Sequence, residues 1–244
     1  MMKRMAVLSL SAILAVSLAA APLLSLASTA DAASSKEWLK ISERVVYYGE
    51  VKDGQPHGKG TIKWGNGKQY SGDFFKGKRT GSGKYMNEYV SDGEKHKVVY
   101  NGSWQDDRME GKGTMTHKVS TGDGTVRWNQ IQSGTYKRDK FQDGYDVIHI
   151  SGDPDYKFYY RNGGERLTVM GSNEDMRTAW TKGRMFSAEY RNGSVHKSYS
   201  IFPESTKAGE RKRAESLRYL QSLKEKVSPI LVRFEQLSKQ VPLK

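Results

Sequence analysis

Cysteine is absent from all 244 residues. The chain therefore has no disulfide, no thiolate metal site, no cysteine nucleophile and no lipid anchor on cysteine. Outside residues 6–27, no apolar run is long enough to span a bilayer. Disorder throughout is not expected, because 14 Tyr, 5 Trp and 7 Phe can build a core. The length suits one or two domains.

Familiar catalytic and metal-binding motifs are also missing. The five histidines show no metal-ligand spacing, and neither H-E-x-x-H nor G-x-S-x-G occurs. Residues 72–78 are similar to the start of a phosphate loop, but Arg79 stands where Ser or Thr would bind Mg²⁺. The sequence therefore predicts no enzyme activity, no cofactor and no metal site.

The first 32 residues have the order of a secretory signal. Lys3 and Arg4 precede an apolar stretch at 6–27, and Ala30 and Ala32 follow it. A charged start, an apolar middle and small residues at the end are typical of a cleaved signal peptide. We predict cleavage after residue 32 and a secreted, extracellular protein that can associate with the cell envelope. An uncleaved membrane anchor is the alternative.

Glycine recurs with one spacing three times between residues 47 and 113. In each unit two further glycines follow the leading glycine by nine and eleven residues, and a tyrosine precedes it by two. The second unit is offset by 23 residues and the third by 30, which predicts a loop insertion near 90–97. The repeat-defining residues are Tyr47, Gly49, Gly58, Gly60, Tyr70, Gly72, Gly81, Gly83, Tyr100, Gly102, Gly111 and Gly113.

Each unit predicts a β-hairpin. Apolar or small residues alternate with polar ones on both sides of Asp53-Gly54, and a period of two indicates a strand with one buried face. Asn66-Gly67, before the second unit, favours a type I′ turn. Nine glycines in strands would cost about 5–9 kcal/mol relative to alanine. We therefore expect some at positive φ in turns and others leaving room for an aromatic ring.

These units resemble the MORN repeat (membrane occupation and recognition nexus), whose pattern is an aromatic residue with Gly-Glu, a turn glycine and Gly-x-Gly. Residues 47–50 and 57–60 show the pattern most clearly. A fourth unit at 133–136, with Gln132 in place of the aromatic residue, is degenerate and is expected to be a terminal cap. The resemblance covers about residues 46–145. It implies a single-layer, non-catalytic sheet that serves as a scaffold, dimerises or contacts lipid head groups.

The predicted fold class is therefore mostly β: an elongated antiparallel sheet of hairpin repeats with a C-terminal amphipathic α-helix. An ordinary β-sandwich is the alternative. The expected segments are 1–32 signal peptide, 33–46 lead-in, 47–145 MORN-repeat sheet, 146–203 diverged β continuation and 204–244 helical segment.

The helix is predicted from apolar residues that recur every three or four positions between Leu217 and Leu237. Pro229 interrupts this stripe, so we expect a kink or a restart there, with Ser228 as N-cap. The stripe needs a partner, because an isolated helix is marginal in water. The sheet end of the same chain, another protein or second copy, and a membrane surface are the three alternatives.

Positive charge is the remaining functional signal, with 40 Lys+Arg against 27 Asp+Glu. A solvated face that keeps the sheet soluble is the simpler explanation. The functional alternative is contact with an anionic surface. Its candidate residues, taken from the densest clusters, are Lys76, Lys78, Arg79, Arg211, Lys212 and Arg213.

The sequence thus predicts an exported, non-enzymatic scaffold or binding module. Its expected partner is an anionic wall polymer or lipid head group of the envelope, or a protein, rather than nucleic acid. A homodimeric assembly protein and an extracellular hydrolase that uses a groove of the sheet are the alternatives.

Overall fold

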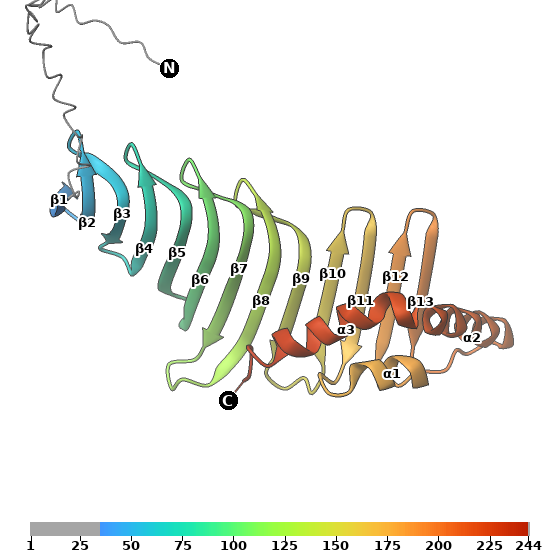
Figure 1. Ribbon diagram of the computed structural model, residues 1–244. Coiled ribbons are helices and arrows are strands. Elements are labelled where there is room, and N and C mark those ends of the chain that lie inside the picture. Colours follow the sequence, from blue (N-terminus) through green and yellow to red (C-terminus); the bar gives the residue numbers. More distant parts are fainter. Residues whose placement is uncertain (1–34, 244) are drawn as a thin grey trace, which may run out of the picture. The chain divides into compact units, whose positions relative to one another are not determined.

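The computed structural model describes residues 35–243. Thirteen strands form one antiparallel sheet in which each strand pairs with its sequence neighbours, as Figure 1 shows. The strands are β1 (Lys36–Ser42), β2 (Val45–Lys52), β3 (Gln55–Trp64), β4 (Lys68–Phe75), β5 (Lys78–Ser91), β6 (Glu94–Gln105), β7 (Arg108–Ser120), β8 (Val126–Lys137), β9 (Lys140–Ile150), β10 (Tyr156–Asn162), β11 (Glu165–Gly171), β12 (Ser187–Asn192) and β13 (Val195–Ser200). The helices are α1 (Met176–Lys182), α2 (Lys207–Ser222) and α3 (Lys224–Ser238).

This architecture confirms the predicted fold class. The signal peptide expected at 1–32 lies outside the described residues and stays a prediction. Over residues 35–243, no helix is both long and apolar enough to cross a membrane. The lead-in expected at 33–46 supplies β1 and the start of β2, and the expected segment boundary at 145/146 falls within β9.

Two-residue turns explain why neighbouring strands pair in order. Asp53 and Gly54 both have positive φ, 52° and 70°, as a type I′ turn requires. This turn suits the right-handed twist of paired strands. The type I′ turn expected at Asn66-Gly67 is wrong, because three residues separate β3 from β4 and Gly67 takes the positive φ of 80° without Asn66.

The loop insertion expected near 90–97 is also wrong. β5 and β6 remain paired until Ser91 faces Glu94 across the turn at 92–93. The extra residues keep the alternation of a strand, and Asp-Gly at the tip closes the hairpin, so they lengthen two strands instead of forming a loop. β7 and β8 pair along the same lengthened region, up to Ser120 and Val126.

The glycines of successive strands lie opposite one another and form a row across the sheet. This glycine row consists of Gly49, Gly60, Gly72, Gly83, Gly102, Gly113, Gly134 and Gly144. At the first six of these glycines a tyrosine ring lies in the space that the missing side chain leaves: a Cβ on Gly60 would stand 2.2 Å from the hydroxyl of Tyr47. At Gly134 and Gly144 the backbone of the facing strand lies there instead. Gly58, Gly81 and Gly111 have positive φ at irregularities within the strands, not at the turns.

The two faces of the sheet exchange roles along its length. We call the face that carries Tyr47, Tyr70, Tyr100 and Tyr136, all buried, the tyrosine face, and the opposite one the helix face. The first buried cluster, in β2 to β8, lies on the tyrosine face, while on the helix face Thr61 and Ser71 share a 2.8 Å hydrogen bond and Trp38 and Tyr48 are exposed. From Ile131 on β8 onward, buried apolar side chains lie on the helix face, where they pack with the helices.

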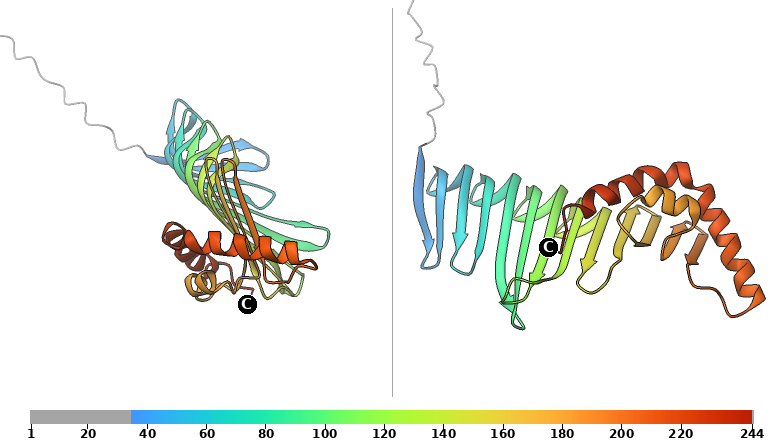
Figure 2. Two further views of the ribbon diagram at one scale, coloured as in Figure 1. Left: turned by 90° about the vertical axis from the view of Figure 1, so that its right-hand side faces the viewer. Right: turned by 90° about the horizontal axis from the view of Figure 1, so that it is seen from below.

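The C-terminal stripe packs on the sheet of its own chain. Five of its residues are buried: Leu220, Val227, Leu231, Phe234 and Leu237. Figure 2 shows α3 along one face of the sheet, whereas α2 lies past β13, the last strand, and contacts it.

The break in the helical segment lies at Leu223, not at the expected Ser228-Pro229. Leu223, with φ −83° and ψ 6°, separates α2 beside β13 from α3 beside α1 and β9. Pro229 lies within the second turn of α3, and Ser228 is not an N-cap. The position of the break follows from packing. Leu220, before the break, and Val227, after it, are both buried, and the two helices pack against different parts of the sheet.

The degenerate fourth unit is not a terminal cap. It forms β8 and β9, and four further strands follow it in the same sheet. The backbone of β9 finds its partners in β10, because the sequence after it continues to alternate.

Candidate functional site

The six basic residues predicted to contact an anionic surface lie in two places. Lys76, Lys78 and Arg79 lie at the turn between β4 and β5, whereas Arg211, Lys212 and Arg213 lie on α2, which contacts β13. Eight strand spacings of about 4.8 Å, roughly 38 Å, separate β5 from β13. The fold therefore does not combine the two clusters into one site.

Arg79 is held between hairpins. Its guanidinium lies 4.4 Å from the centroid of the Trp104 ring, and its Nε is 3.0 Å from the carboxylate of Asp107. Lys78 makes a 3.3 Å ion pair with Asp106 on the same neighbouring turn. These contacts join one hairpin to the next and leave Arg79 with a side chain only 19% exposed.

Arg213 also has internal partners. Its Nε lies 3.0 and 2.9 Å from the two carboxylate oxygens of Glu210, and this hydrogen bonding lowers the pKa of Glu210 to about 2. Its Nη1 donates to the carbonyl of Ser200, so the side chain ties α2 to β13. Arg211 and Lys212 are exposed.

A site that the sequence did not predict begins where the glycine row ends. Gly144 on β9 lies opposite Arg161, and the same register then places Arg166, Arg191 and His196 side by side on β11, β12 and β13. We call these four residues the arginine row. It lies on the tyrosine face, on the side of the sheet away from the helices.

The sequence contained one signal for this row. Tyr-Arg-Asn-Gly occurs at 160–163 and again at 190–193, and each copy predicts a hairpin tip. Only the strand register shows that Arg166 stands between the two arginines of these copies.

The charges of the row are compensated at its ends and not in its middle. Arg161 donates to the carbonyl of Phe141 at 3.0 Å, and Arg191 pairs with Glu189, which also lies 3.2 Å from His196. Within residues 35–243, no side-chain partner is found for Arg166. Like charges that lie directly opposite on neighbouring strands are destabilising. The row therefore holds one exposed guanidinium, that of Arg166, without a side-chain partner.

A hollow of about 440 Å³ opens beside this charge. It is lined by Phe141, Gly144, Asp146, Tyr159, Arg161 and Arg166, among others. Gln130 and Gln132 donate to the two oxygens of Asp146 at 2.8 and 2.9 Å, while burial raises the pKa of this carboxyl. The hollow thus combines aromatic side chains, two guanidinium groups and a carboxyl group that is hydrogen-bonded to two glutamine amides.

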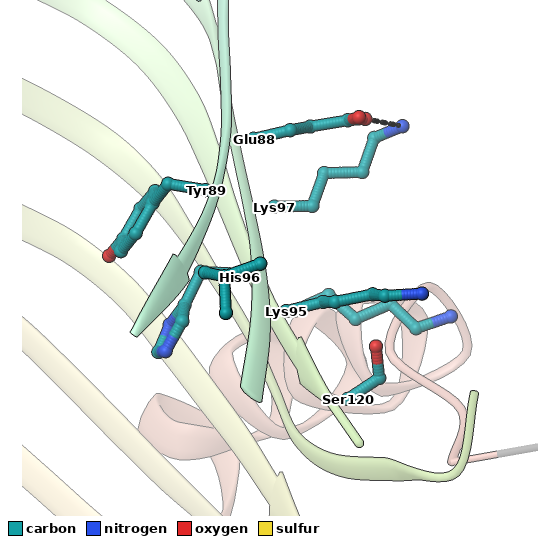
Figure 3. A pocket seen from close by; sticks show the side chains of 8 residues that line it. Glu88, Tyr89, Lys95, His96, Lys97 and Ser120 are labelled. Carbon is teal, nitrogen blue, oxygen red and sulfur yellow. Dashed lines mark ion pairs between the residues drawn. The ribbon is translucent and has the colours of Figure 1, made fainter. Parts of the chain in front are cut away.

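A second hollow, of about 420 Å³, lies along the lengthened hairpin of β5 and β6 (Figure 3). Lys95, Lys97 and Lys118 line it, and Lys97 lies directly opposite Lys118. Glu88 pairs with Lys97 at 2.6 Å. Figure 3 shows the side chains of Lys95 and Lys97 on one side of the hairpin, whereas Tyr89 and His96 point away on the other.

The rings on the other side belong to a stack on the tyrosine face. Tyr89 stacks on His96, whose Nδ1 lies 3.1 Å from Nε2 of His117. Burial, and then the neighbouring His96, lower the pKa of His117. No group of three His, Asp or Glu residues in the described part of the chain is arranged to hold a metal ion.

Comparison with known proteins agrees with this geometry. The MORN repeat family matches residues 47–69, 70–86 and 100–118, which lie in β2 to β7. The human protein Alsin is 38% identical over 72 residues, which is 29% of this chain and 4% of Alsin. MORN repeat-containing protein 3 of Xenopus laevis is 39% identical over 89 residues.

The matched segment is 34% of this chain and 37% of the Xenopus protein, so the chain spans well under half of the relatives it matches. The arginine row lies outside the three matched segments. The first half of the sheet is therefore built from MORN repeats, whose occurrence indicates a binding or scaffold module.

Proposed function

We propose that the chain is an exported, non-enzymatic scaffold that binds an anionic component of the cell envelope. One observation carries the proposal: on neighbouring strands of the arginine row, Arg166 lies directly opposite both Arg161 and Arg191. Lys97 also lies opposite Lys118, but Glu88 already pairs with Lys97. Like charges that lie directly opposite one another lower the stability of the folded chain, and a bound anion would offset this cost.

The residues of the hollow favour binding over hydrolysis. Glycoside hydrolysis uses two carboxyl groups that flank the bond. In the hollow beside the arginine row, Asp146 has both oxygens bonded to glutamine amides, and no second carboxyl group belongs to its lining. An extracellular hydrolase is therefore the less supported alternative.

Export follows from the sequence of residues 1–32 alone. An exported protein meets wall polymers and lipid head groups, so these are the anions that we assign to it. Secretion from a bacterial host should yield a mature chain that begins at Ala33, as intact-mass measurement would show. Retention of residues 1–32 would contradict cleavage.

Binding is tested by sedimentation of the full chain with envelope preparations. Exposed charges interact over a Debye length of about 10 Å at 0.1 M salt and about 3 Å at 1 M. We expect most of the protein to sediment at low salt and to be released at 1 M. Equal binding at both salt concentrations would refute the electrostatic proposal.

Self-association through β1 is a second candidate function. Within residues 35–243, β1 pairs with β2 alone, and Trp38 on this strand is 71% exposed. An open strand edge with apolar residues can pair with another chain. Light scattering should then show that the full chain is a dimer. The Trp38→Lys variant should dissociate to monomers at higher protein concentration than the wild type. A monomeric wild-type chain would contradict this candidate.

A further inference from the structure

The hollow beside Arg161 and Arg166 combines features that recognise more than charge. We propose that it binds one acidic sugar unit of an envelope glycan: Arg166 and Arg161 take the acidic group, and Tyr159 lies against the sugar ring. This inference rests on the proposed function and specifies its ligand and its site.

The contacts of the two arginines indicate that the ligand carries an acidic group. Arg161 is already oriented by the carbonyl of Phe141, and its Nε lies 3.7 Å from Asp143. Arg166 faces it on the next strand. The planar fork of a guanidinium pairs with a carboxylate through two parallel hydrogen bonds, which a lysine cannot do. An acidic group between the two arginines would compensate the charge of Arg166.

The side chains that line the hollow indicate that the ligand also carries a sugar ring. The Tyr159 side chain lines the hollow with 39% of its surface exposed, and Phe141 lines it as well. Aromatic rings provide a rigid apolar surface with little loss of conformational entropy, which suits the C–H face of a pyranose. Gln132 and Thr168 add an amide and a hydroxyl that can bond sugar hydroxyl groups.

The size and position of the hollow fit a unit within a chain. A volume of about 440 Å³ is in the range of small-molecule sites. Gly144 contributes no side chain to it, and Arg166 in its lining is exposed, so a polymer chain can leave the hollow at that wall. A phosphodiester-linked polyol has no ring for Tyr159, and the head group of phosphatidylglycerol likewise brings no sugar face to the aromatic wall.

The experiment measures binding of the full chain to three immobilised polymers: polygalacturonate, poly(glycerol phosphate) and neutral dextran. Arg166→Gln removes the uncompensated charge, and Tyr159→Ser removes the ring. Arg218→Gln is the matched control, because it makes the same change at another exposed arginine, on α2.

We expect wild type to prefer polygalacturonate to poly(glycerol phosphate) and not to bind dextran. Arg166→Gln should weaken binding to polygalacturonate about tenfold, since a hydrogen bond to a charged group is lost. Arg218→Gln should change it less than about twofold. Tyr159→Ser should weaken binding to polygalacturonate and leave binding to poly(glycerol phosphate) unchanged. Unchanged melting curves would show that the variants fold.

Three results would overturn the inference. Equal losses in Arg166→Gln and Arg218→Gln would mean diffuse attraction, and the proposed function would survive without this site. Equal binding of the two anionic polymers, insensitive to Tyr159→Ser, would mean that charge alone is recognised. Absence of binding to both polymers, while envelope preparations still bind in a salt-dependent way, would refute an acidic sugar as the ligand. The proposal of an envelope-binding scaffold would remain.

Discussion

Replacing Gly83 by alanine should destabilise the sheet strongly, although alanine normally suits a strand better than glycine. Gly83 has no positive φ, so backbone strain does not contribute. The added Cβ would stand 2.3 Å from the hydroxyl oxygen of Tyr70 and 2.4 Å from its ring carbons, where ordinary contacts begin at 3.4 Å. The ring must therefore move by about 1 Å.

The cost can be worked out from what Tyr70 would lose. Its side chain is fully buried, packs edge to face on Phe74 and Trp104, and donates to the carbonyls of Asp73 and Thr80. Overpacking costs about 1–3 kcal/mol, and a hydrogen bond contributes about 0.5–1.5 kcal/mol. We expect a loss of about 2–5 kcal/mol in the free energy of unfolding, which lowers the melting temperature by about 4–20 °C.

Thermal and urea unfolding, followed by circular dichroism, measure this loss. Gly122→Ala is the matched control, because nothing lies within 4 Å of its added Cβ and its φ is not positive. It should be neutral or stabilise by up to about 1 kcal/mol. In the background Tyr70→Leu, Gly83→Ala should cost at least about 1 kcal/mol less than in wild type. Additive effects, or equal effects of the two glycine variants, would refute the argument that glycine makes room for the ring.

Three further predictions follow from other parts of the fold. The pKa of His117 is lowered in the folded chain from 6.5, so the unfolded state binds more protons below this pH. Stability should fall as the pH drops from about 7 to 5, and His117→Gln should reduce the slope of melting temperature against pH; identical slopes would contradict this. Arg166→Gln should raise the free energy of unfolding by about 0.2–1 kcal/mol by removing like-charge opposition, whereas destabilisation in urea titrations would argue for an internal partner. A chain that ends at Phe202 exposes the apolar helix face of β9–β13 and should bind a hydrophobic dye and aggregate; a soluble product that melts cooperatively would contradict the packing of α2 and α3.

Local patterns in the sequence were sufficient for the building blocks. The spacing of Tyr47, Gly49 and Gly60 predicts a hairpin because alternation and turn residues act between neighbours in the chain. The same pattern predicts that a ring lies over glycine, and the stripe from Leu217 to Leu237 predicts a helix that needs a partner. These features depend on residues within about ten positions of one another.

Features that depend on the pairing of distant residues were not predictable in this way. The break at Leu223, instead of at Pro229, was set by what each half of the helical segment covers. The extended hairpin at 90–97 shows that an insertion in a repeat can lengthen two strands as readily as it forms a loop.

The sequence by itself determined the repeating hairpins, their order in one antiparallel sheet and the presence of a C-terminal amphipathic segment. Each of these features depends on residues that are close to one another in the chain. Only the tertiary structure decided which face each side chain joins and which residues meet across strands. Arg161, Arg166 and Arg191 are scattered in the chain and become neighbours through strand register, which long-range hydrogen bonding sets. The candidate site is therefore a product of register, because the local repeat at 160–163 and 190–193 contains only two of its arginines and does not show that they become neighbours of Arg166.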